Sequence, residues 1–402
     1  MPAVETLLTR LAQDPQYPTQ GATLFVDLQR KETRRAYTPR HVVETFLEGR
    51  GGNMFYLYNL LSPTEPEGPL SPRTPLIFGA GVLTGIVPSA ARGNATSWSP
   101  ETHFLMDSNC GDYFPSFLKL SGYDRLVILG RADDWTYLYI EGEKVEFRDA
   151  RHWAGLDQLE LRERVELELG GKWTRDLAMA AISSAGERGV LCAGIMGGPK
   201  AIFARGGTGA KMGAHRLKAI VVRGFDPKLG FGARPAEVKP YNREVARQVL
   251  DTSVVKHGLK LRGSPFLYRP SRILGAIGAL NNQNNTWTEA LDAENIDPYR
   301  PEMTGCFRCP VNCRPMNDLT LQGRGQGDKY DKGDGPEYVT VGKFGPMIGI
   351  SDLGQLIRLN NIANDLGLDT ASLGSSISWA MELYQRGIID KETTGGLDLT
   401  WG

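Results

Sequence analysis

The chain has 402 residues, a length that permits two or three domains and a well-buried core. Lysine plus arginine and aspartate plus glutamate number 46 each, so the formal net charge is zero. This balance argues against a nucleic-acid partner, because such proteins usually carry net positive charge or a basic patch. No stretch approaches the ~18 apolar residues that a membrane-spanning helix needs, so we expect no membrane span.

The N-terminus and the cysteines bear on the compartment in which the protein resides. Residues 1–20 form an N-terminal extension with neither an apolar h-region nor a small-residue cleavage site, so we expect a cytoplasmic protein. The five cysteines are an odd number, and three of them fall within eight residues. In a large chain without a secretory signal, this pattern indicates metal chemistry rather than a disulfide framework.

Residues 21–224 contain short apolar runs separated by turn residues, which predict a β-rich first domain. The run at 76–81 ends in a glycine turn, and the segment 137–147 has the pattern of a hairpin around Gly142. The predicted strands lie at 23–28, 76–81, 125–129, 137–140, 145–147 and 219–222.

Proline and glycine are concentrated at about 225–240, and beyond this shift the pattern becomes helical. Ser351 and Asp352 can cap a helix whose apolar stripe runs from 353 to 366 and which Gly367 ends. A second helix is expected over 377–384, ending at Gly387. We therefore expect an α+β fold, with a β-rich domain at 21–224 and a mainly helical domain at 225–402.

Three cysteines form a compact motif in the second domain: Cys306-x-x-Cys309-x-x-x-Cys313. Thiolates at this spacing can converge on one iron–sulfur cluster if the backbone curls round it, and Gly305 and Pro310 suit such a curl. A zinc site is the main alternative, but it needs four ligands and no cysteine or histidine follows Cys313. Structural thiols are a further alternative.

The strongest glycine signal lies just before the last predicted strand of the first domain. Its sequence is Ala204-Arg205-Gly206-Gly207-Thr208-Gly209-Ala210-Lys211-Met212-Gly213. The loop is not a P-loop, because Lys211 is followed by Met212, and we expect only a short turn before the next strand rather than a dinucleotide-binding helix. Backbone N–H groups beside Arg205 suit an anionic, phosphate-bearing ligand, although a plain tight turn remains the alternative.

Two more polar glycine loops occur in the same domain, at 91–94 and 107–111. Each contains arginine or asparagine. One such loop would be weak evidence, but three in one β-rich domain suggest one large polar cofactor bound there.

In this order, the motifs of the chain resemble those of the aldehyde:ferredoxin oxidoreductase family from about residue 21 to the end. The segments that carry the resemblance are Leu83-Thr84-Gly85 with Arg92; Asn109-Cys110-Gly111 with Gly122-Tyr123-Asp124; Ala185-Gly186-Glu187; the glycine loop at 205–213; Leu217-Lys218-Ala219; the cysteine motif; Gly335-Pro336-Glu337-Tyr338; and Asp365-Leu366-Gly367-Leu368-Asp369.

The resemblance implies tungsten or molybdenum held by two pterins, a nearby [4Fe–4S] cluster and room for a bound Mg²⁺. In the family, the first domain forms a base beneath the pterins. The positions that match its pterin contacts are Arg92, Asn109, Gly111, Ala204, Arg205, Gly206 and Gly207. From the second domain, Asn364, Leu368 and Asp369 match a loop that holds one pterin. The matching cluster ligands are Cys306, Cys309 and Cys313.

This sequence departs from the family pattern in three respects. The fourth cluster cysteine and the second pterin-holding loop belong to a third domain that we expect this chain to lack. We therefore expect the fourth cluster ligand to come from an upstream cysteine or histidine, from another chain or from a missing segment. A family glutamate near the metal is Val339 here, which puts the aldehyde-oxidising acid/base assignment in doubt. A carboxylate that binds a metal between subunits in one member is Arg358, so that mode of dimerisation is not implied.

The resemblance implies an oxidoreductase that converts a small aldehyde to a carboxylic acid, or that catalyses a related low-potential two-electron reaction. Its electrons would pass to a ferredoxin-like carrier or an electron-transfer subunit, and a homo-oligomer remains an alternative to a monomer. The competing hypothesis is a truncated or degenerate chain that binds a cluster or pterin without catalysis. The sequence does not assign a catalytic residue.

Overall fold

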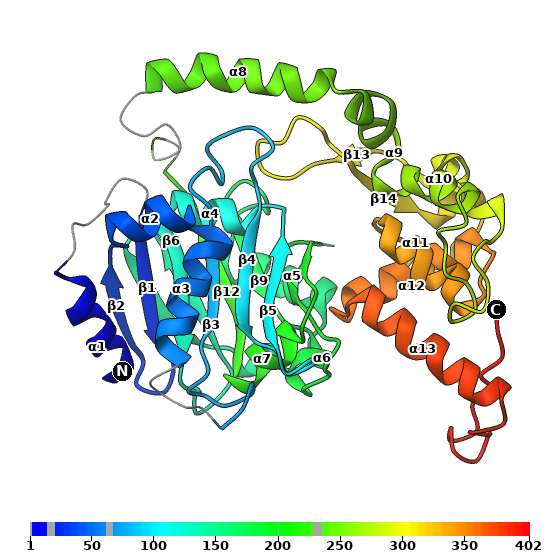
Figure 1. Cartoon of the computed structure of the whole chain (residues 1–402), viewed down its shortest axis with the longest axis horizontal. Helices are drawn as coiled ribbons and strands as arrows, with labels where there is room; N and C mark the ends of the chain where they lie inside the picture. Colours follow the sequence, from blue (N-terminus) through cyan, green and yellow to red (C-terminus); the bar gives the residue numbers. More distant parts are fainter. Residues whose placement is uncertain (1, 14–20, 62–66, 200, 227, 229–234) are drawn as a thin grey trace. The chain divides into compact units, whose positions relative to one another are not determined.

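The computed structural model describes residues 2–13, 21–61, 67–199, 201–226, 228 and 235–402, and its elements are labelled in Figure 1. The chain divides into two compact units. The first comprises Met1–Arg247, Cys306–Pro310 and Asp365–Gly367, and the second comprises Gln248–Gly305, Val311–Asn364 and Leu368–Gly402. No helix among the described residues is long and apolar enough to cross a membrane.

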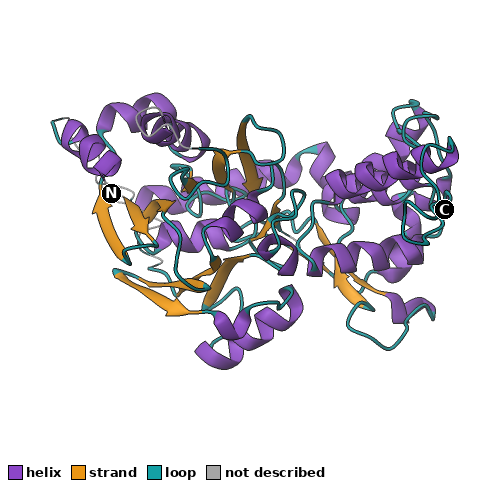
Figure 2. Ribbon diagram, turned by 90° about the horizontal axis from the view of Figure 1, so that it is seen from below, coloured by secondary structure: helices purple, strands orange, loops and turns teal. Residues whose placement is uncertain are grey.

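The first unit contains two six-stranded sheets, seen as orange arrows in Figure 2. In the first sheet β1 and β6 are parallel, and the remaining neighbours are antiparallel. Its order is β2 (Glu32–Ala36), β1 (Ala22–Asp27), β6 (Tyr123–Leu129), β3 (Leu76–Ala80), β4 (Gly93–Trp98) and β5 (Leu105–Cys110). The second sheet has the order β11 (Ile202–Phe203), β10 (Ile195–Met196), β9 (Leu177–Ala181), β12 (Leu217–Arg223), β7 (Thr136–Glu141) and β8 (Lys144–Asp149).

One apolar core joins the inner faces of the two sheets. Phe78 and Leu126 of the first sheet share it with Leu138 and Ile220 of the second. Strand residues alternate between two faces, so the outer faces need covers of their own. On the first sheet, α3 (Gly49–Leu61) and α1 (Pro2–Leu11) supply the cover, and on the second sheet α5 (Gln158–Leu169) does. The remaining helices before α8 are α2 (Arg40–Phe46), α4 (Phe114–Leu120), α6 (Ser184–Glu187) and α7 (Thr208–Ala214).

The second unit is mainly helical around its own apolar core, which includes Tyr268, Phe344 and Leu356. Asp352 accepts a hydrogen bond from the Gln355 backbone N–H at 2.9 Å and so caps the start of α12, as the sequence predicts. Its helices are α9 (Lys260–Arg262), α10 (Tyr268–Ile273), α11 (Tyr338–Phe344), α12 (Leu353–Asp365) and α13 (Thr370–Gln385), and its small sheet contains β13 (Met303–Thr304), β14 (Arg314–Asp318) and β15 (Lys332–Asp334).

The mixed fold with a sheet-rich first part and a helical second part is confirmed, and every predicted strand is present to within a few residues. The first domain is less purely β than predicted, because α3 and α5 were not foreseen. Helix α8 (Pro235–Asp251) begins inside the segment read as a proline-rich shift. The second predicted helix begins earlier, at Thr370, because Asp369 caps it there.

Candidate cofactor site

Arg92 and Asn109 lie together at the adjoining ends of β4 and β5. The Arg92 Nη1 donates a hydrogen bond to Asn109 Oδ1 at 2.5 Å, and Asn109 Nδ2 donates to the Gly93 carbonyl at 3.2 Å. Asn109 is on β5 opposite Asn94 of β4 in the antiparallel register. The sheet thus fixes the position of an exposed arginine.

The Leu83-Thr84-Gly85 motif shapes the loop that leads to Arg92. Thr84 Oγ1 accepts a hydrogen bond from the Gly81 N–H at 3.0 Å and donates one to the Arg92 carbonyl at 2.8 Å. The Gly85 N–H donates to the Ala90 carbonyl at 2.7 Å and closes the loop. The motif therefore positions Arg92 through the backbone.

Gly111 follows β5 and approaches Cys306 closely. A Cβ at Gly111 would lie 3.1 Å from Cys306 Sγ and 3.9 Å from Arg92 Cγ, so the absence of a side chain permits this approach. The Phe307 N–H donates to the Asp112 carbonyl at 3.2 Å, and its ring packs edge-on against Phe117 at a centroid distance of 6.0 Å. These contacts bring the first cysteine of the motif to the end of β5.

The next part of the cysteine motif lies beside the same loop. Cys309 is half-buried, with its Sγ 3.5 Å from Ser89 Oγ. Arg308 Nη1 donates to the Gly85 carbonyl at 3.0 Å, and partial burial lowers the pKa of Arg308. Cys306 and Cys309 are thus both placed next to the loops that follow β3 and β5.

Cys313 belongs to the second unit, where it precedes β14. Among the residues that the structure describes, no group of three or more histidine, cysteine, aspartate or glutamate side chains is arranged to hold a metal ion. The assignment of all three cysteines as ligands therefore stays a prediction.

The loop at 204–207 differs from the sequence interpretation. A helix, α7, follows it where a short turn was predicted. Its glycines serve close packing, because a Cβ at Gly209 would lie 2.5 Å from the Gly194 carbonyl oxygen, and one at Gly213 would lie 2.2 Å from that of Gly186. The sequence shows these glycines, but it does not show that α7 packs against the backbone at Gly186 and Gly194.

Backbone N–H groups of this loop are already used within the protein. The Arg205 N–H donates to Ser108 Oγ at 3.0 Å, and the Gly206 N–H donates to Glu101 Oε2 at 3.0 Å. Arg205 itself is exposed, while Ala204 is half-buried and Gly206 and Gly207 are buried. The structure thus brings the loop to β5 but does not leave these two N–H groups for an anion.

The segment Asp365–Gly367 is anchored within the first unit. Asp365 Oδ1 accepts a hydrogen bond from the Leu159 N–H and its carbonyl accepts one from Ser183 Oγ, both at 2.8 Å. The Gly367 carbonyl accepts one from the Gly194 N–H at 2.9 Å. This turn is therefore tied to α5 and to the ends of β9 and β10.

Asn364, Leu368 and Asp369 make structural contacts within the second unit. Asn364 Nδ2 donates to the Asp334 carbonyl at 3.0 Å, and the Leu368 N–H donates to the Ala363 carbonyl at 2.9 Å as α12 ends. Asp369 caps α13 by accepting from the Ala371 and Ser372 N–H groups at 3.1 and 3.2 Å. Their assignment to a pterin loop stays a prediction.

The motifs Ala185-Gly186-Glu187 and Leu217-Lys218-Ala219 meet in a buried ion pair. Lys218 Nζ contacts Glu187 Oε1 and donates to the Leu156 carbonyl at 2.8 Å. Lys218 is fully buried, so Glu187 offsets the cost of removing its charge from water. These motifs stabilise the fold rather than supply a ligand.

Two further residues, Cys110 and Asp112, lie beside the cysteine motif. Cys110 is buried. Burial is the main cause that raises the pKa of the Cys110 thiol well above 9.0, and the negative charge of Asp112 is the second. Asp112 has φ +71° and is 1% exposed, so it holds an unfavourable backbone conformation beside Phe307. Nothing in the sequence predicts this backbone conformation of Asp112. Cys192 is half-buried.

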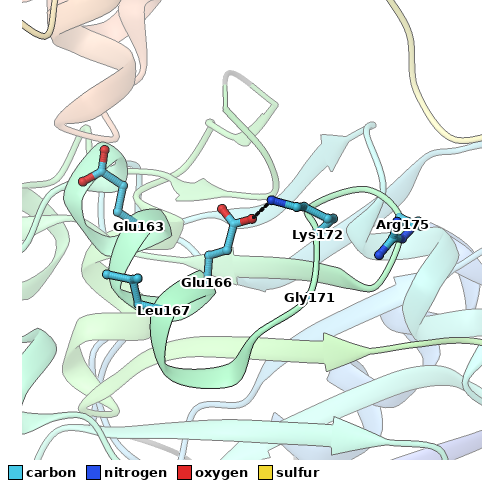
Figure 3. A pocket seen from close by; sticks show the side chains of 6 residues that line it. All are labelled: Glu163, Glu166, Leu167, Gly171, Lys172 and Arg175. Atoms are coloured by element: carbon cyan, nitrogen blue, oxygen red, sulfur yellow. Dashed lines mark hydrogen bonds and ion pairs between the residues drawn. The ribbon is translucent and has the colours of Figure 1, made fainter.

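Figure 3 shows an open hollow elsewhere, formed by α5 and the turn after it. Lys172 Nζ and Glu166 Oε1 face each other there at 3.5 Å. Two carboxylates and two cations balance the charge, and no residue of the predicted site lines the hollow. Of the predicted site residues, Arg92, Asn109, Gly111 and Cys306 lie together elsewhere, around the end of β5.

Comparisons with known proteins identify the family. Residues 23–224 match the model of the aldehyde ferredoxin oxidoreductase N-terminal domain, and residues 241–402 match that of its domains 2 and 3. The tungsten-containing aldehyde ferredoxin oxidoreductase of Pyrococcus abyssi is 35% identical over 86% of this chain and 56% of its own length. That of Pyrococcus furiosus is 32% identical over 96% and 62%.

Similarity extends to relatives with other names. The aliphatic sulfonate oxidoreductase, WOR-like subunit, of Pyrococcus furiosus is 28% identical over 96% of this chain and 62% of its own length. The solved active-site complex BamBC of benzoyl coenzyme A reductase with 1,5-dienoyl-CoA matches with a TM-score of 0.75 and 28% identity, over 95% of this chain and 58% of that one. The chain spans about three fifths of the length of the relatives it matches, and it belongs to the aldehyde ferredoxin oxidoreductase family.

Proposed function

We propose that this protein is a tungsten- or molybdenum-pterin iron–sulfur oxidoreductase. It oxidises an aldehyde to a carboxylic acid with a ferredoxin-like acceptor, or it catalyses a related low-potential two-electron reaction. The observation that carries the proposal is the convergence of Arg92, Asn109 and Gly111 with Cys306 in the first unit. Residues expected to bind pterin and a residue expected to ligate the cluster are neighbours, as electron transfer between the two groups requires.

The residues present fit such groups. Gly111 leaves space beside Cys306 Sγ that a side chain would fill, and Cys309 is half-buried rather than enclosed. Arg92 is exposed while its guanidinium is fixed by Asn109, which suits recognition of a polar, anionic cofactor. A pterin-bound metal supplies the two-electron chemistry and the cluster transfers the electrons singly, while this chain binds and orients both.

One residue of the second unit bears on the choice between aldehyde oxidation and a related reaction. Val339, on α11, is 44% exposed and stands where the family resemblance places a glutamate. Glu337, two residues earlier, is hydrogen-bonded to Ser264 Oγ. Without a carboxylate at 339, proton transfer to or from an aldehyde-derived intermediate must use another group, which favours the related reaction over simple aldehyde oxidation.

The proposal is tested by elemental analysis of protein purified without oxygen. We expect tungsten or molybdenum, iron and acid-labile sulfide, and a loss of most iron in Cys309→Ser, because an alkoxide is a poorer iron–sulfur ligand than a thiolate. Cys192→Ser is the matched control and should keep its iron. Stoichiometric zinc without sulfide would overturn the proposal.

A second measurement separates catalysis from binding alone. The loaded chain is assayed with a set of aldehydes and a viologen acceptor. Turnover supports the oxidoreductase. Bound metal and cluster without turnover of any tested substrate would support the alternative, a chain that binds these groups and does not catalyse.

A further inference from the structure

Arg50, which no motif identified, lies at the start of α3 and contacts β5, the strand that also carries Asn109. Its Nε donates to Asp107 Oδ2 at 2.6 Å, although the Arg50 side chain is 67% exposed. Among the described residues, neither terminal nitrogen of Arg50 has a hydrogen-bond partner. One edge of the guanidinium is therefore anchored, and the other edge keeps its donors for a ligand.

Asp107 is a firm anchor for Arg50. Its side chain is 9% exposed. Oδ1 accepts from Thr96 Oγ1 at 2.8 Å, and Oδ2 also accepts from Asn94 Nδ2 at 2.7 Å. The carboxylate is held from three directions, so the position of the Arg50 guanidinium is determined by β4 and β5.

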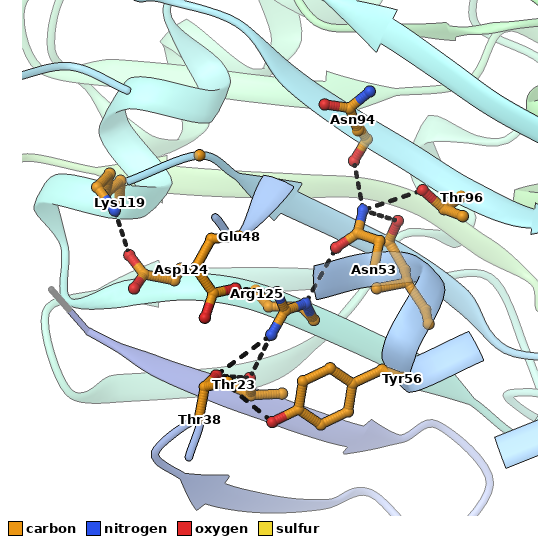
Figure 4. A network of polar contacts seen from close by, with 12 residues as sticks. Thr23, Thr38, Glu48, Asn53, Tyr56, Asn94, Thr96, Lys119, Asp124 and Arg125 are labelled. Atoms are coloured by element: carbon orange, nitrogen blue, oxygen red, sulfur yellow. Dashed lines mark hydrogen bonds and ion pairs between the residues drawn. The ribbon is translucent and has the colours of Figure 1, made fainter. Parts of the chain in front are cut away.

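A buried network holds β4 in turn, as Figure 4 shows. Asn53 of α3 donates to the Asn94 carbonyl at 3.3 Å and to Thr96 Oγ1 at 3.0 Å. Asn53 Oδ1 accepts from Arg125 Nε at 3.0 Å. Arg125 is fully buried and pairs with Glu48. Such a fixed supporting structure is what a preorganised binding site needs.

Arg50 and Arg92 are anchored in the same way, each by a side chain of β5. Asp107 and Asn109 are two residues apart on β5, so their side chains lie on one face about 7 Å apart along the strand. Asp107 anchors Arg50, and Asn109 anchors Arg92. Arg50 is also in the first turn of α3, a 13-residue helix whose N-terminal end carries partial positive charge.

We propose that Arg50 and Arg92 together bind the phosphate of the pterin cofactor. Two guanidiniums whose anchoring residues lie about 7 Å apart on β5 can each donate to different oxygens of a phosphate ester. The Asp107 carboxylate already accepts from donors of its own. This inference rests on the proposed function for the statement that the ligand is a pterin. The statement that the ligand carries a phosphate rests only on the two arginines anchored along β5.

The test measures pyrophosphate binding to the full chain by calorimetry, together with the pterin content of protein as purified. Arg50→Gln and Arg92→Gln should each weaken pyrophosphate binding about tenfold or more, the effect of losing one charge-assisted contact. Arg40→Gln is the matched control, since Arg40 is exposed at the start of α2 and paired with Glu44. It should leave binding unchanged.

The outcomes separate this inference from the proposed function. Unchanged pyrophosphate affinity in Arg50→Gln, or no binding by the native chain, overturns the Arg50 site even if pterin is present. Weaker binding in Arg50→Gln and not in Arg40→Gln supports the site. If that result is found in protein that never contains pterin, tungsten or molybdenum, the phosphate site stands and the proposed function fails.

Discussion

Replacement of Lys211 by methionine is expected to stabilise the protein. Lys211 lies on α7 with its side chain fully buried, and its Nζ donates to the Ser71 carbonyl at 2.9 Å. No carboxylate pairs with it among the described residues. Burial alone lowers its pKa well below 10.5, and His215, one turn later, is buried as well.

The magnitude follows from what methionine keeps and loses. It preserves most of the volume and removes the cost of burying an ionisable amine, but it leaves the Ser71 carbonyl without its donor. Apolar replacement of buried charged groups is commonly worth about 1–4 kcal/mol, and a lost hydrogen bond costs about 1 kcal/mol. We therefore expect a gain of roughly 1–2 kcal/mol at pH 7.

The gain should depend on pH. Between the lowered folded-state pKa and 10.5, unfolded Lys211 binds a proton that the folded form does not, so the native protein becomes more stable as the pH rises. One group contributes a slope of at most about 1.4 kcal/mol per pH unit. Lys211→Met removes this contribution, so its advantage should shrink towards pH 10.

Urea unfolding at pH 7 and pH 9.5 measures both effects. Lys218→Met is the matched control: it is equally buried but paired with Glu187, so its loss leaves an uncompensated carboxylate and should destabilise by about 3–5 kcal/mol. If Lys211→Met destabilises the protein like Lys218→Met, with no change in the pH slope, the reasoning from unpaired burial is refuted.

Three further changes probe the site and its support. Gly111→Val should reduce bound iron far more than Gly111→Ala, as assayed colorimetrically, because its side chain extends towards Cys306 Sγ. Asp369→Asn should preserve the α13 cap, with a melting temperature within a few degrees of the native value, so a loss of pterin in this variant would indicate direct contact with the cofactor. Glu48→Gln should lower unfolding stability by about 3 kcal/mol in urea titration, since Arg125 stays buried without its countercharge.

The strands were predictable because most are buried on both faces and appear as continuous apolar runs. All six residues of β1 and all five of β3 are buried. The start of α3 was not predictable, because its glycines disfavour a helix. Gly52 is required there by Arg125, whose Nη2 would lie 2.0 Å from an added Cβ. That demand comes from β6, far away in the sequence.

The candidate site was predictable where residues form a motif. Motifs pointed to Arg92, Asn109 and Cys306, and the structure places these residues near one another, while their roles stay a prediction. Arg50 belongs to no pattern: its partner Asp107 is 57 positions away, and the two meet only because α3 packs on the first sheet. Pairing of this kind depends on tertiary structure, so single-sequence reasoning does not reach it.

The Glu48–Arg125 pair can be tested for a positioning role apart from its effect on the stability of the fold, and we expect it to have such a role. A buried ion pair is a poor source of stability, because desolvation offsets its attraction. We infer that Arg125 instead fixes the position of Asn53. Asn53 in turn holds the β4 segment that supports Asp107 and Arg50.

The double variant Glu48→Leu with Arg125→Met tests this role. It should unfold at higher urea concentration than Glu48→Gln, because no charge remains buried and unpaired. It should nevertheless bind pyrophosphate more weakly than the native chain, since Asn53 Oδ1 loses its donor and no longer holds Thr96 in place. Native affinity in a stable double variant would show that the network supports the fold and does not position Arg50.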